Sequence, residues 1–291
     1  MKSKFLFPTW CVIVGYLLVI PGFILGYLTV FNKYEIPGFG FKLREADLVF
    51  KTAFENFTNE LAIFLVVIGL LLIAFSKDKK EDELTAKMRL NALYWGIMVY
   101  YVLYITLLLS SLLIGELPFV GDHVSELNIF TPLLIFICRY NYLKYFNPGS
   151  YLLREPKFLP HQPFKTIGIS LFFVAVIAFI GGSIFSENLL TNFPLQETYL
   201  VLVTSAVIWA FSRNKIEDEM TMQLRMENMQ LAVYFNYAVL LIATICFYSV
   251  DYLVVLLFAQ FSLLLFFIIR MEYVNYQNKQ LLTAAEGGIE S

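Results

Sequence analysis

The chain has 291 residues, of which 59% are hydrophobic, 17% are aromatic and only 15% are charged. These proportions lie well outside the range of a soluble domain of this length, so the sequence predicts an integral membrane protein whose first partner is the lipid bilayer. The formal net charge of −2 argues against nucleic acid as a partner.

Apolar stretches recur along the whole chain, and several approach the about 20 residues that a helix needs to cross a hydrocarbon core. Lys2 and Lys4 precede the first stretch, which is too long for a secretory signal and is expected to stay in place as a span. The sequence therefore predicts an all-α polytopic membrane protein with eight transmembrane helices. The predicted spans are 10–31, 61–75, 92–114, 129–146, 167–185, 199–211, 232–248 and 252–269.

The segment between the first two predicted spans mixes apolar and charged residues. Phe41, Leu43, Leu48 and Phe50 are interleaved with charges at rough helical spacing. We therefore expect a short amphipathic helix at about 41–57 that lies on the outer membrane surface.

One motif occurs twice. The first motif, FSKDKKEDELTAKMR, covers 75–89, and the second motif, FSRNKIEDEMTMQLR, covers 211–225. Downstream, FICRYNYLKYFN from Phe136 aligns with FIIRMEYVNYQN from Phe267. We therefore interpret the chain as a tandem duplication. The identical positions of the two motifs include Phe75 and Phe211, Ser76 and Ser212, Glu81 and Glu217, Asp82 and Asp218, Glu83 and Glu219, Thr85 and Thr221, and Arg89 and Arg225.

The duplication predicts how the chain is organised. Each copy holds four predicted spans, an even number, so both copies should enter the membrane in the same orientation, as two parallel four-helix repeats. The first copy covers 1–147 and the second copy covers 166–278. A proline-rich linker at 148–165 separates them, because its prolines prevent a continuous helix. Residues 279–291 are expected to form a short cytoplasmic tail.

The distribution of Lys and Arg predicts the orientation. Basic residues gather in 77–87, 144–165 and 213–225, whereas three loops on the other predicted side contain none. Positively charged loops stay on the cytoplasmic side, so these segments and both termini should be cytoplasmic.

The repeated motif has a structural interpretation. Asp78 is followed by Glu81, and Asn214 by Glu217, at the spacing of a capping box that starts a helix. Acidic residues in the first helical turn are favoured by the helix dipole. On this interpretation the motif is a helix start that is written twice.

The motif also has functional interpretations. Two acidic clusters at the cytoplasmic mouth could together hold a hard cation such as Mg²⁺, which takes carboxylate oxygens and keeps waters for a phosphate ligand. Alternatively, Arg89 and Arg225 could pair with Asp82 and Asp218 across the copies and clasp the copies together, or the cluster could accept a cytoplasmic protein partner. The candidate residues are Glu81, Asp82, Glu83, Arg89, Glu217, Asp218, Glu219 and Arg225.

The motif resembles two families. Its acidic runs KEDEL and IEDEM occupy positions similar to the acid-rich motifs of UbiA-type prenyltransferases, which bind a diphosphate through Mg²⁺. The first UbiA motif itself, an Asn-Asp pair followed by further Asp residues, is absent. SKDKKEDELTAKMRLNAL and SRNKIEDEMTMQLRMENM also resemble an uncharacterised family of multi-pass membrane proteins of Bacteroidetes, which implies a location in the bacterial inner membrane.

Other sequence features do not point to catalysis. The chain has only two histidines, His123 and His161, on opposite predicted sides, so they cannot build a histidine metal site or a Ser-His-Asp triad. Few polar residues fall at mid-membrane, which disfavours an ion-coupled carrier. The sequence therefore predicts a non-catalytic membrane protein that binds, senses or scaffolds, with no cofactor other than a candidate Mg²⁺. A Mg²⁺-dependent UbiA-like prenyltransferase and a transporter of lipids or apolar small molecules are the alternatives.

Overall fold

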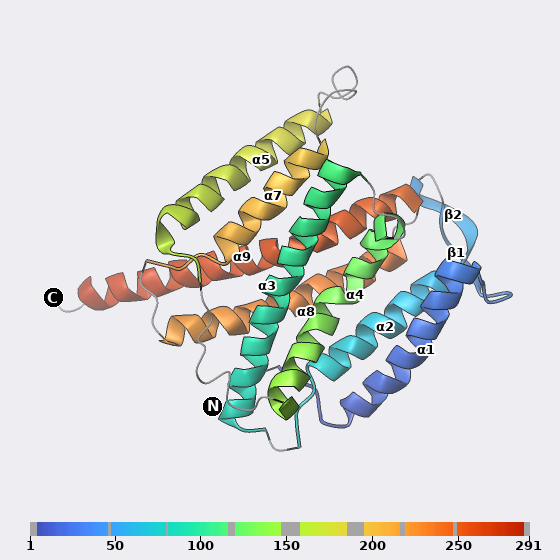
Figure 1. Cartoon of the computed structure of the whole chain (residues 1–291), viewed down its shortest axis with the longest axis horizontal. Coiled ribbons are helices and arrows are strands. Elements are labelled where there is room, and N and C mark those ends of the chain that lie inside the picture. Colours follow the sequence, from blue (N-terminus) through green and yellow to red (C-terminus); the bar gives the residue numbers. More distant parts are fainter. Residues whose placement is uncertain are drawn as a thin grey trace. The chain divides into compact units, whose positions relative to one another are not determined.

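The chain is helical apart from one β-hairpin in the part that the computed structural model describes (Figure 1). The described residues are 5–45, 48–79, 81–115, 120–146, 158–184, 195–215, 219–246 and 249–287. The elements are α1 (Cys11–Asn32), β1 (Gly40–Glu45), β2 (Leu48–Asn56), α2 (Thr58–Ala74), α3 (Glu83–Ile114), α4 (Val120–Asn141), η1 (Tyr142–Phe146), η2 (His161–Lys165), α5 (Thr166–Ile184), α7 (Leu195–Ala210), α8 (Glu219–Cys246) and α9 (Ser249–Gly287).

Five of the described helical segments are long and apolar enough to cross a membrane. They correspond to the first, third, fifth, seventh and eighth predicted spans, and they suggest a membrane location. Helix α2 is apolar but has only 17 residues, and α7 has 16, so eight crossings are not confirmed. The five segments are Cys11–Asn32, Glu83–Ile114, His161–Gly182, Glu219–Cys246 and Val255–Asn278.

The chain divides into two compact units, each built from separate stretches of sequence. Unit 1 contains α1, the hairpin, α2 and α4, together with parts of α3, α8 and α9. Unit 2 contains α5 and α7, with the remaining parts of the same three long helices. Unit 1 consists of 1–100, 118–156 and 236–260, and unit 2 of 101–117, 157–235 and 261–291.

The amphipathic helix expected at 41–57 is wrong, because the structure has the antiparallel strands β1 and β2 there. The sequence contains the reason. Phe41 and Leu43 alternate with Lys42 and Arg44, and this period of two is typical of a strand rather than a helix. The register pairs Gly40 with Asn56, so the hairpin leads directly into α2.

Helix α9 continues to Gly287 and so includes most of the segment 279–291, which is expected to form the tail. The sequence NKQLLTAAE at 278–286 has no proline or glycine, and most of its residues are good helix formers. The helix therefore does not stop where the apolar stretch ends.

Glycines set the close approach of α1 and α2 in unit 1. A Cβ atom on Gly15 would lie 2.8 Å from the Gly69 carbonyl oxygen, and one on Gly69 would lie 2.8 Å from the Gly15 carbonyl oxygen. Gly22 lies against Val66 in the same interface. Small residues allow membrane helices to approach closely, so dispersion contacts between the two backbones hold this pair.

Unit 2 contains a helix pair of the same kind. Helices α5 and α7 lie side by side (Figure 1), and a Cβ atom on Gly168 would lie 2.8 Å from the Trp209 backbone nitrogen. Gly15 makes its close approach near Ile73, and Ile73 aligns with Trp209 when the two motifs are aligned. In both cases a glycine of the preceding helix lies against the backbone two residues before the motif.

We expect Gly69→Ala to lower the melting temperature in detergent, because the added methyl group has no space between α1 and α2. Overpacking of this kind costs about 1–3 kcal/mol. Gly181→Ala in α5 is the matched control, since nothing lies within 4 Å of its Cβ position. The control should be neutral or stabilising, because alanine is the better helix former. Equal melting temperatures for Gly69→Ala and the wild type would contradict the close approach.

Candidate functional site

The first motif begins where α2 ends and pairs with the segment before α1. The Phe7 amide donates to the Phe75 carbonyl oxygen at 2.9 Å, and the Lys77 amide donates to the Phe7 carbonyl oxygen at 2.9 Å. This pairing is a short parallel β-bridge between Phe7 and Ser76. It fixes the segment before α1 against the segment that connects α2 to α3.

Asp82 caps α3, which corrects the capping position expected from the sequence. Its Oδ1 atom accepts hydrogen bonds from the Thr85 amide at 2.7 Å and the Thr85 hydroxyl at 2.6 Å. The helix therefore begins at Glu83 rather than after Asp78. Of the expected Asp78–Glu81 capping box, only the bond from the Asp78 amide to Glu81 Oε2, 2.9 Å long, is present. That bond closes a turn before the helix.

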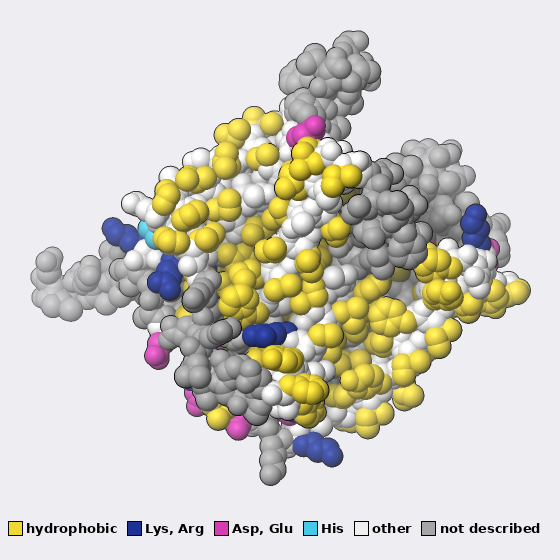
Figure 2. Space-filling view, in the orientation of Figure 1, with side chains coloured by type: hydrophobic (Ala, Val, Ile, Leu, Met, Phe, Trp, Pro, Cys, Tyr) yellow, Lys and Arg dark blue, Asp and Glu magenta, His cyan; other side chains and the backbone are white. Residues whose placement is uncertain are grey.

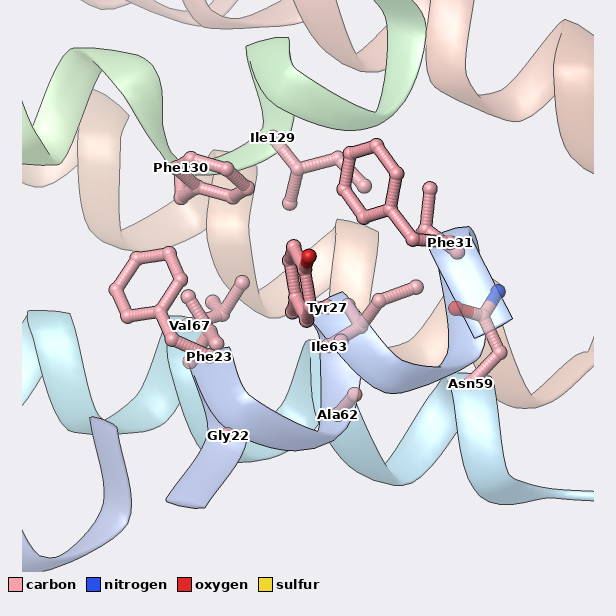
Figure 3. A pocket seen from close by; sticks show the side chains of 13 residues that line it. Gly22, Phe23, Tyr27, Phe31, Asn59, Ala62, Ile63, Val67, Ile129 and Phe130 are labelled. Carbon is pink, nitrogen blue, oxygen red and sulfur yellow. The ribbon is translucent and has the colours of Figure 1, made fainter. Parts of the chain in front are cut away.

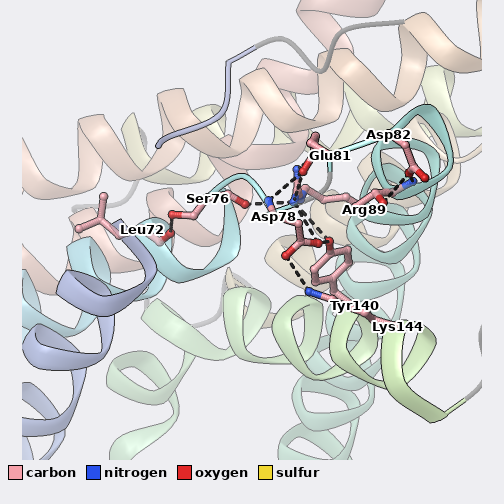
Figure 4. Close-up of polar contacts among 9 residues, drawn as sticks. Leu72, Ser76, Asp78, Glu81, Asp82, Arg89, Tyr140 and Lys144 are labelled. Atoms are coloured by element: carbon pink, nitrogen blue, oxygen red, sulfur yellow. Dashed lines mark hydrogen bonds and ion pairs between the residues drawn. The ribbon is translucent and has the colours of Figure 1, made fainter. Parts of the chain in front are cut away.

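Arg89 lies at the centre of the first site and is only 3% exposed (Figure 4). Its Nη1 and Nη2 atoms donate to the two carboxylate oxygens of Glu81 at 2.8 and 3.2 Å. Nη2 also donates to the Ser76 carbonyl oxygen at 3.0 Å and to the Tyr140 hydroxyl at 3.3 Å. The Arg89 guanidinium group thus connects α3 with the segment between α2 and α3, through Ser76 and Glu81, and with α4, through Tyr140.

Asp78 forms the second half of this network. It accepts hydrogen bonds from the Tyr140 hydroxyl and from Lys144 Nζ, the latter at 2.7 Å. Burial acts to raise the pKa of Asp78, but these hydrogen bonds and the charges of Lys144 and Arg89 outweigh it, so the pKa is lowered. Two carboxylates, on Asp78 and Glu81, therefore face two cations, on Arg89 and Lys144, and the charges balance.

The second motif repeats the backbone pairing. The Leu159 amide donates to the Phe211 carbonyl oxygen at 2.9 Å, and the Arg213 amide donates to the Leu159 carbonyl oxygen at 2.8 Å. Residues 158–165, which the sequence analysis assigned to the linker, thus pair with the second motif as the segment before α1 pairs with the first. Helix α8 begins at Glu219, the position aligned with Glu83.

Arg225 occupies the position of Arg89 and is also 3% exposed. Its Nη1 donates to the carbonyl oxygens of Ala210 at 3.1 Å and Ser212 at 3.0 Å. The Phe158 ring lies 4.6 Å from its guanidinium carbon, a cation–π distance. Both arginines therefore bind the carbonyl oxygen of the serine in their own motif, Ser76 or Ser212.

One pair of contacting residues changes its chemistry between the motifs. Asp78 and Lys144, which form an ion pair, align with Asn214 and Asn275. Asn214 and Asn275 also contact each other, with an Asn214 Nδ2 to Asn275 Oδ1 distance of 3.2 Å. Both aligned pairs are therefore in contact, one through charged groups and the other through amides.

A separate ion pair lies beside the second motif. Lys165 Nζ lies 2.9 Å from Glu272 Oε1 and donates to Asn214 Oδ1 at 3.0 Å. The Trp209 indole N–H also donates to Glu272 Oε1, at 3.3 Å. The sequence does not point to Lys165 and Glu272, because neither residue is identical between the aligned stretches and their contact joins segments more than 100 residues apart.

The structure brings together only part of the predicted set. Glu81 and Arg89 meet, and Asp82 caps the helix nearby. Glu83 is exposed and pairs with Lys87 one turn along α3, at 3.5 Å. Glu217 and Asp218 lie outside the described residues, and Glu219 begins α8 on its exposed surface.

The described residues contain no group of three or more His, Cys, Asp or Glu side chains arranged to hold a metal ion. In the first motif the oxygens of Asp78 and Glu81 are already used by Arg89, Tyr140 and Lys144. His161 contacts the Arg213 carbonyl oxygen at 2.9 Å, so it takes part in the second backbone joint.

An apolar pocket that the sequence did not predict lies in unit 1 among α1, α2 and α4 (Figure 3). Its volume is about 340 Å³. Phe23 and Phe130 meet edge to face across it, with ring centroids 5.2 Å apart. The Tyr27 hydroxyl and the Asn59 amide are its side-chain polar groups. Gly26 presents no side chain here, and a Cβ atom at Gly26 would have only the Ala62 Cβ within 4 Å, so it leaves space on the surface of α1.

Comparisons of the chain with known protein families, with characterised proteins and with solved structures find no match. Both family resemblances of the motif therefore stay predictions.

We expect the singly substituted Asp78→Asn and Lys144→Asn proteins to be less stable by about 1 kcal/mol each, because each loses an ion pair that is partly exposed. The double substitution should recover part of this loss, since it recreates the amide pair seen at Asn214 and Asn275. Thermal unfolding of the four proteins in detergent measures the coupling. Strictly additive losses would contradict a direct interaction.

The lowered pKa of Asp78 predicts a pH dependence. Its stabilising effect should be complete above its unfolded pKa, near 3.8, and should be lost as the pH falls from there through the lower folded pKa. The difference in melting temperature between the wild type and Asp78→Asn should therefore shrink as the pH is lowered from about 6 to about 3. A difference that is constant over this range would contradict the ionised Asp78.

Proposed function

We propose that this protein binds an apolar ligand within the bacterial inner membrane, in the pocket among α1, α2 and α4, and that it is not an enzyme. The pocket carries the proposal. Its volume of about 340 Å³ falls within the range of small-molecule sites, about 300–1,000 Å³, which are mostly apolar with a few polar groups. Here those polar groups are Tyr27 and Asn59.

The position of the pocket supports entry from the lipid phase. Tyr27 and Phe31 line it and are 60% and 47% exposed, so its mouth lies at the outer surface of α1. That surface is hydrophobic, as in the yellow regions of Figure 2, and it includes the exposed side chains of Ile20 and Ile24. A ligand dissolved in the bilayer can reach such a mouth without crossing water.

We propose that the two motifs are structural joints within two parallel four-helix copies, with both termini cytoplasmic. Three features support a duplication: the repeated β-bridge, the repeated bond from the arginine to a serine carbonyl oxygen, and the paired change from Asp78–Lys144 to Asn214–Asn275. The carboxylates of Asp78 and Glu81 already accept hydrogen bonds from the side chains of Lys144 and Arg89. This favours a structural role over Mg²⁺ and diphosphate binding in the first copy.

The test uses oleyl alcohol, a neutral long-chain probe, and follows the melting temperature in detergent. We expect oleyl alcohol to stabilise the wild type. Gly26→Leu should abolish the shift by filling the pocket, because Gly26 lies on its wall and has only the Ala62 Cβ within 4 Å of its own Cβ position.

Leu17→Phe is the matched control, since Leu17 is 68% exposed on α1 and does not line the pocket. It should retain the full shift. An unchanged shift in Gly26→Leu would refute the pocket as the binding site. A shift produced only by Mg²⁺ together with farnesyl diphosphate would instead support the prenyltransferase alternative.

A further inference from the structure

We propose that a groove between α3 and α4 in unit 1 binds an anionic phospholipid, with the lipid phosphate held by Arg139. The groove has a volume of about 250 Å³ and is lined by Trp95, Gly96, Val99, Ile135 and Arg139. It shares no residue with the pocket among α1, α2 and α4. The proposal therefore does not depend on the function proposed for that pocket.

Arg139 has unused hydrogen-bonding capacity. Its Nε atom is buried without a partner, and the guanidinium group makes no ion pair or hydrogen bond with any described residue. Its guanidinium carbon lies 5.8 Å from the centroid of the Tyr142 ring, a cation–π distance. A guanidinium group carries five N–H donors, so Arg139 can donate to an acceptor that is not part of the protein.

The aligned arginine of the second copy has a protein partner. Arg270 aligns with Arg139, and its Nε donates to Asn228 Oδ1 at 3.3 Å. Asn228 aligns with Ala92 of the first copy, which has no side-chain acceptor to offer. The first copy has thus retained the arginine while lacking the amide that binds it in the second copy.

The groove itself is filled in the second copy. Val99 and Ile135 align with Phe235 and Phe266. The rings of Phe235 and Phe266 meet edge to face, with centroids 4.3 Å apart and an interplanar angle of 87°. Two aromatic rings therefore occupy the space that smaller side chains leave open in the first copy, so the open groove and the unpaired arginine occur together.

The lining of the groove fits a phospholipid. Arginine binds phosphate oxygens bidentately, and its planar group is less strongly hydrated than an ammonium group. Trp95, Val99 and Ile135 offer an apolar wall for an acyl chain, and Val99 is 40% exposed at the surface. Arg139 lies in the last turn of α4, next to the basic segment that starts at Lys144, where anionic headgroups gather at the cytoplasmic face. Figure 2 shows basic side chains within a largely hydrophobic surface in the region of α3 and α4.

The test measures phosphatidylglycerol binding to the purified protein by native mass spectrometry, with phosphatidylcholine as the zwitterionic comparison. We expect phosphatidylglycerol to bind more tightly than phosphatidylcholine. Arg139→Gln should weaken phosphatidylglycerol binding at least about tenfold, which corresponds to about 1.4 kcal/mol, because a charge-assisted hydrogen bond is lost. Val99→Phe with Ile135→Phe should weaken it as well by filling the groove as in the second copy.

Arg270→Gln is the matched control and should leave phosphatidylglycerol binding unchanged, because Arg270 already has a protein partner. Glycerol phosphate, which has no acyl chain, should not bind detectably at the same concentration. The proposal is overturned if Arg139→Gln binds phosphatidylglycerol as the wild type does, if Arg270→Gln loses binding to the same extent, or if glycerol phosphate binds as tightly as the lipid.

Discussion

A buried arginine that binds a main-chain carbonyl oxygen is the interaction on which both halves of this chain depend. Arg89 binds the Ser76 carbonyl oxygen and Arg225 binds the Ser212 carbonyl oxygen, each at 3.0 Å. The end of an apolar helix leaves carbonyl groups without intrahelical partners, and such groups are costly to bury unpaired. A guanidinium group supplies several donors from one side chain. It thereby allows a helix of 17 residues to end and turn back within a buried corner.

The two copies use this joint with different surroundings. In the first, the charge of Arg89 is balanced by Glu81 and the corner also holds the ion pair of Asp78 with Lys144. In the second, the described contacts of Arg225 include the Ala210 and Ser212 carbonyl oxygens and the Phe158 ring, and the amides of Asn214 and Asn275 stand where the first has its ion pair. The aligned positions carry matched partners, charge with charge beside the first motif and amide with amide beside the second. A polar group whose partner is lost is destabilising, which accounts for the matched chemistry of each pair.

The sequence predicted the features that depend on composition and spacing. Apolar length located the five helical segments that are long and apolar enough to cross a membrane, and identity between the motifs located both arginines. Two local patterns have more than one interpretation. The residues at 41–57 fit a rough helical period as well as the period of two of the observed strands. Asp78 with Glu81 has the spacing of a capping box, whereas Asp82, which caps the helix, is followed at that spacing by Thr85. The apolar pocket could not be predicted, because it arises from side chains of three helices and from the space beside Gly26.

Hydrogen exchange at the two β-bridges tests most directly whether each arginine supports its own joint. The informative amides are those of Phe7 and Lys77 in the first bridge, and of Leu159 and Arg213 in the second. In an Arg89→Met protein, the account predicts faster exchange at Phe7 and Lys77 and unchanged protection at Leu159 and Arg213. Loss of protection at both bridges, as a clasp between the copies would produce, or at neither, would contradict it.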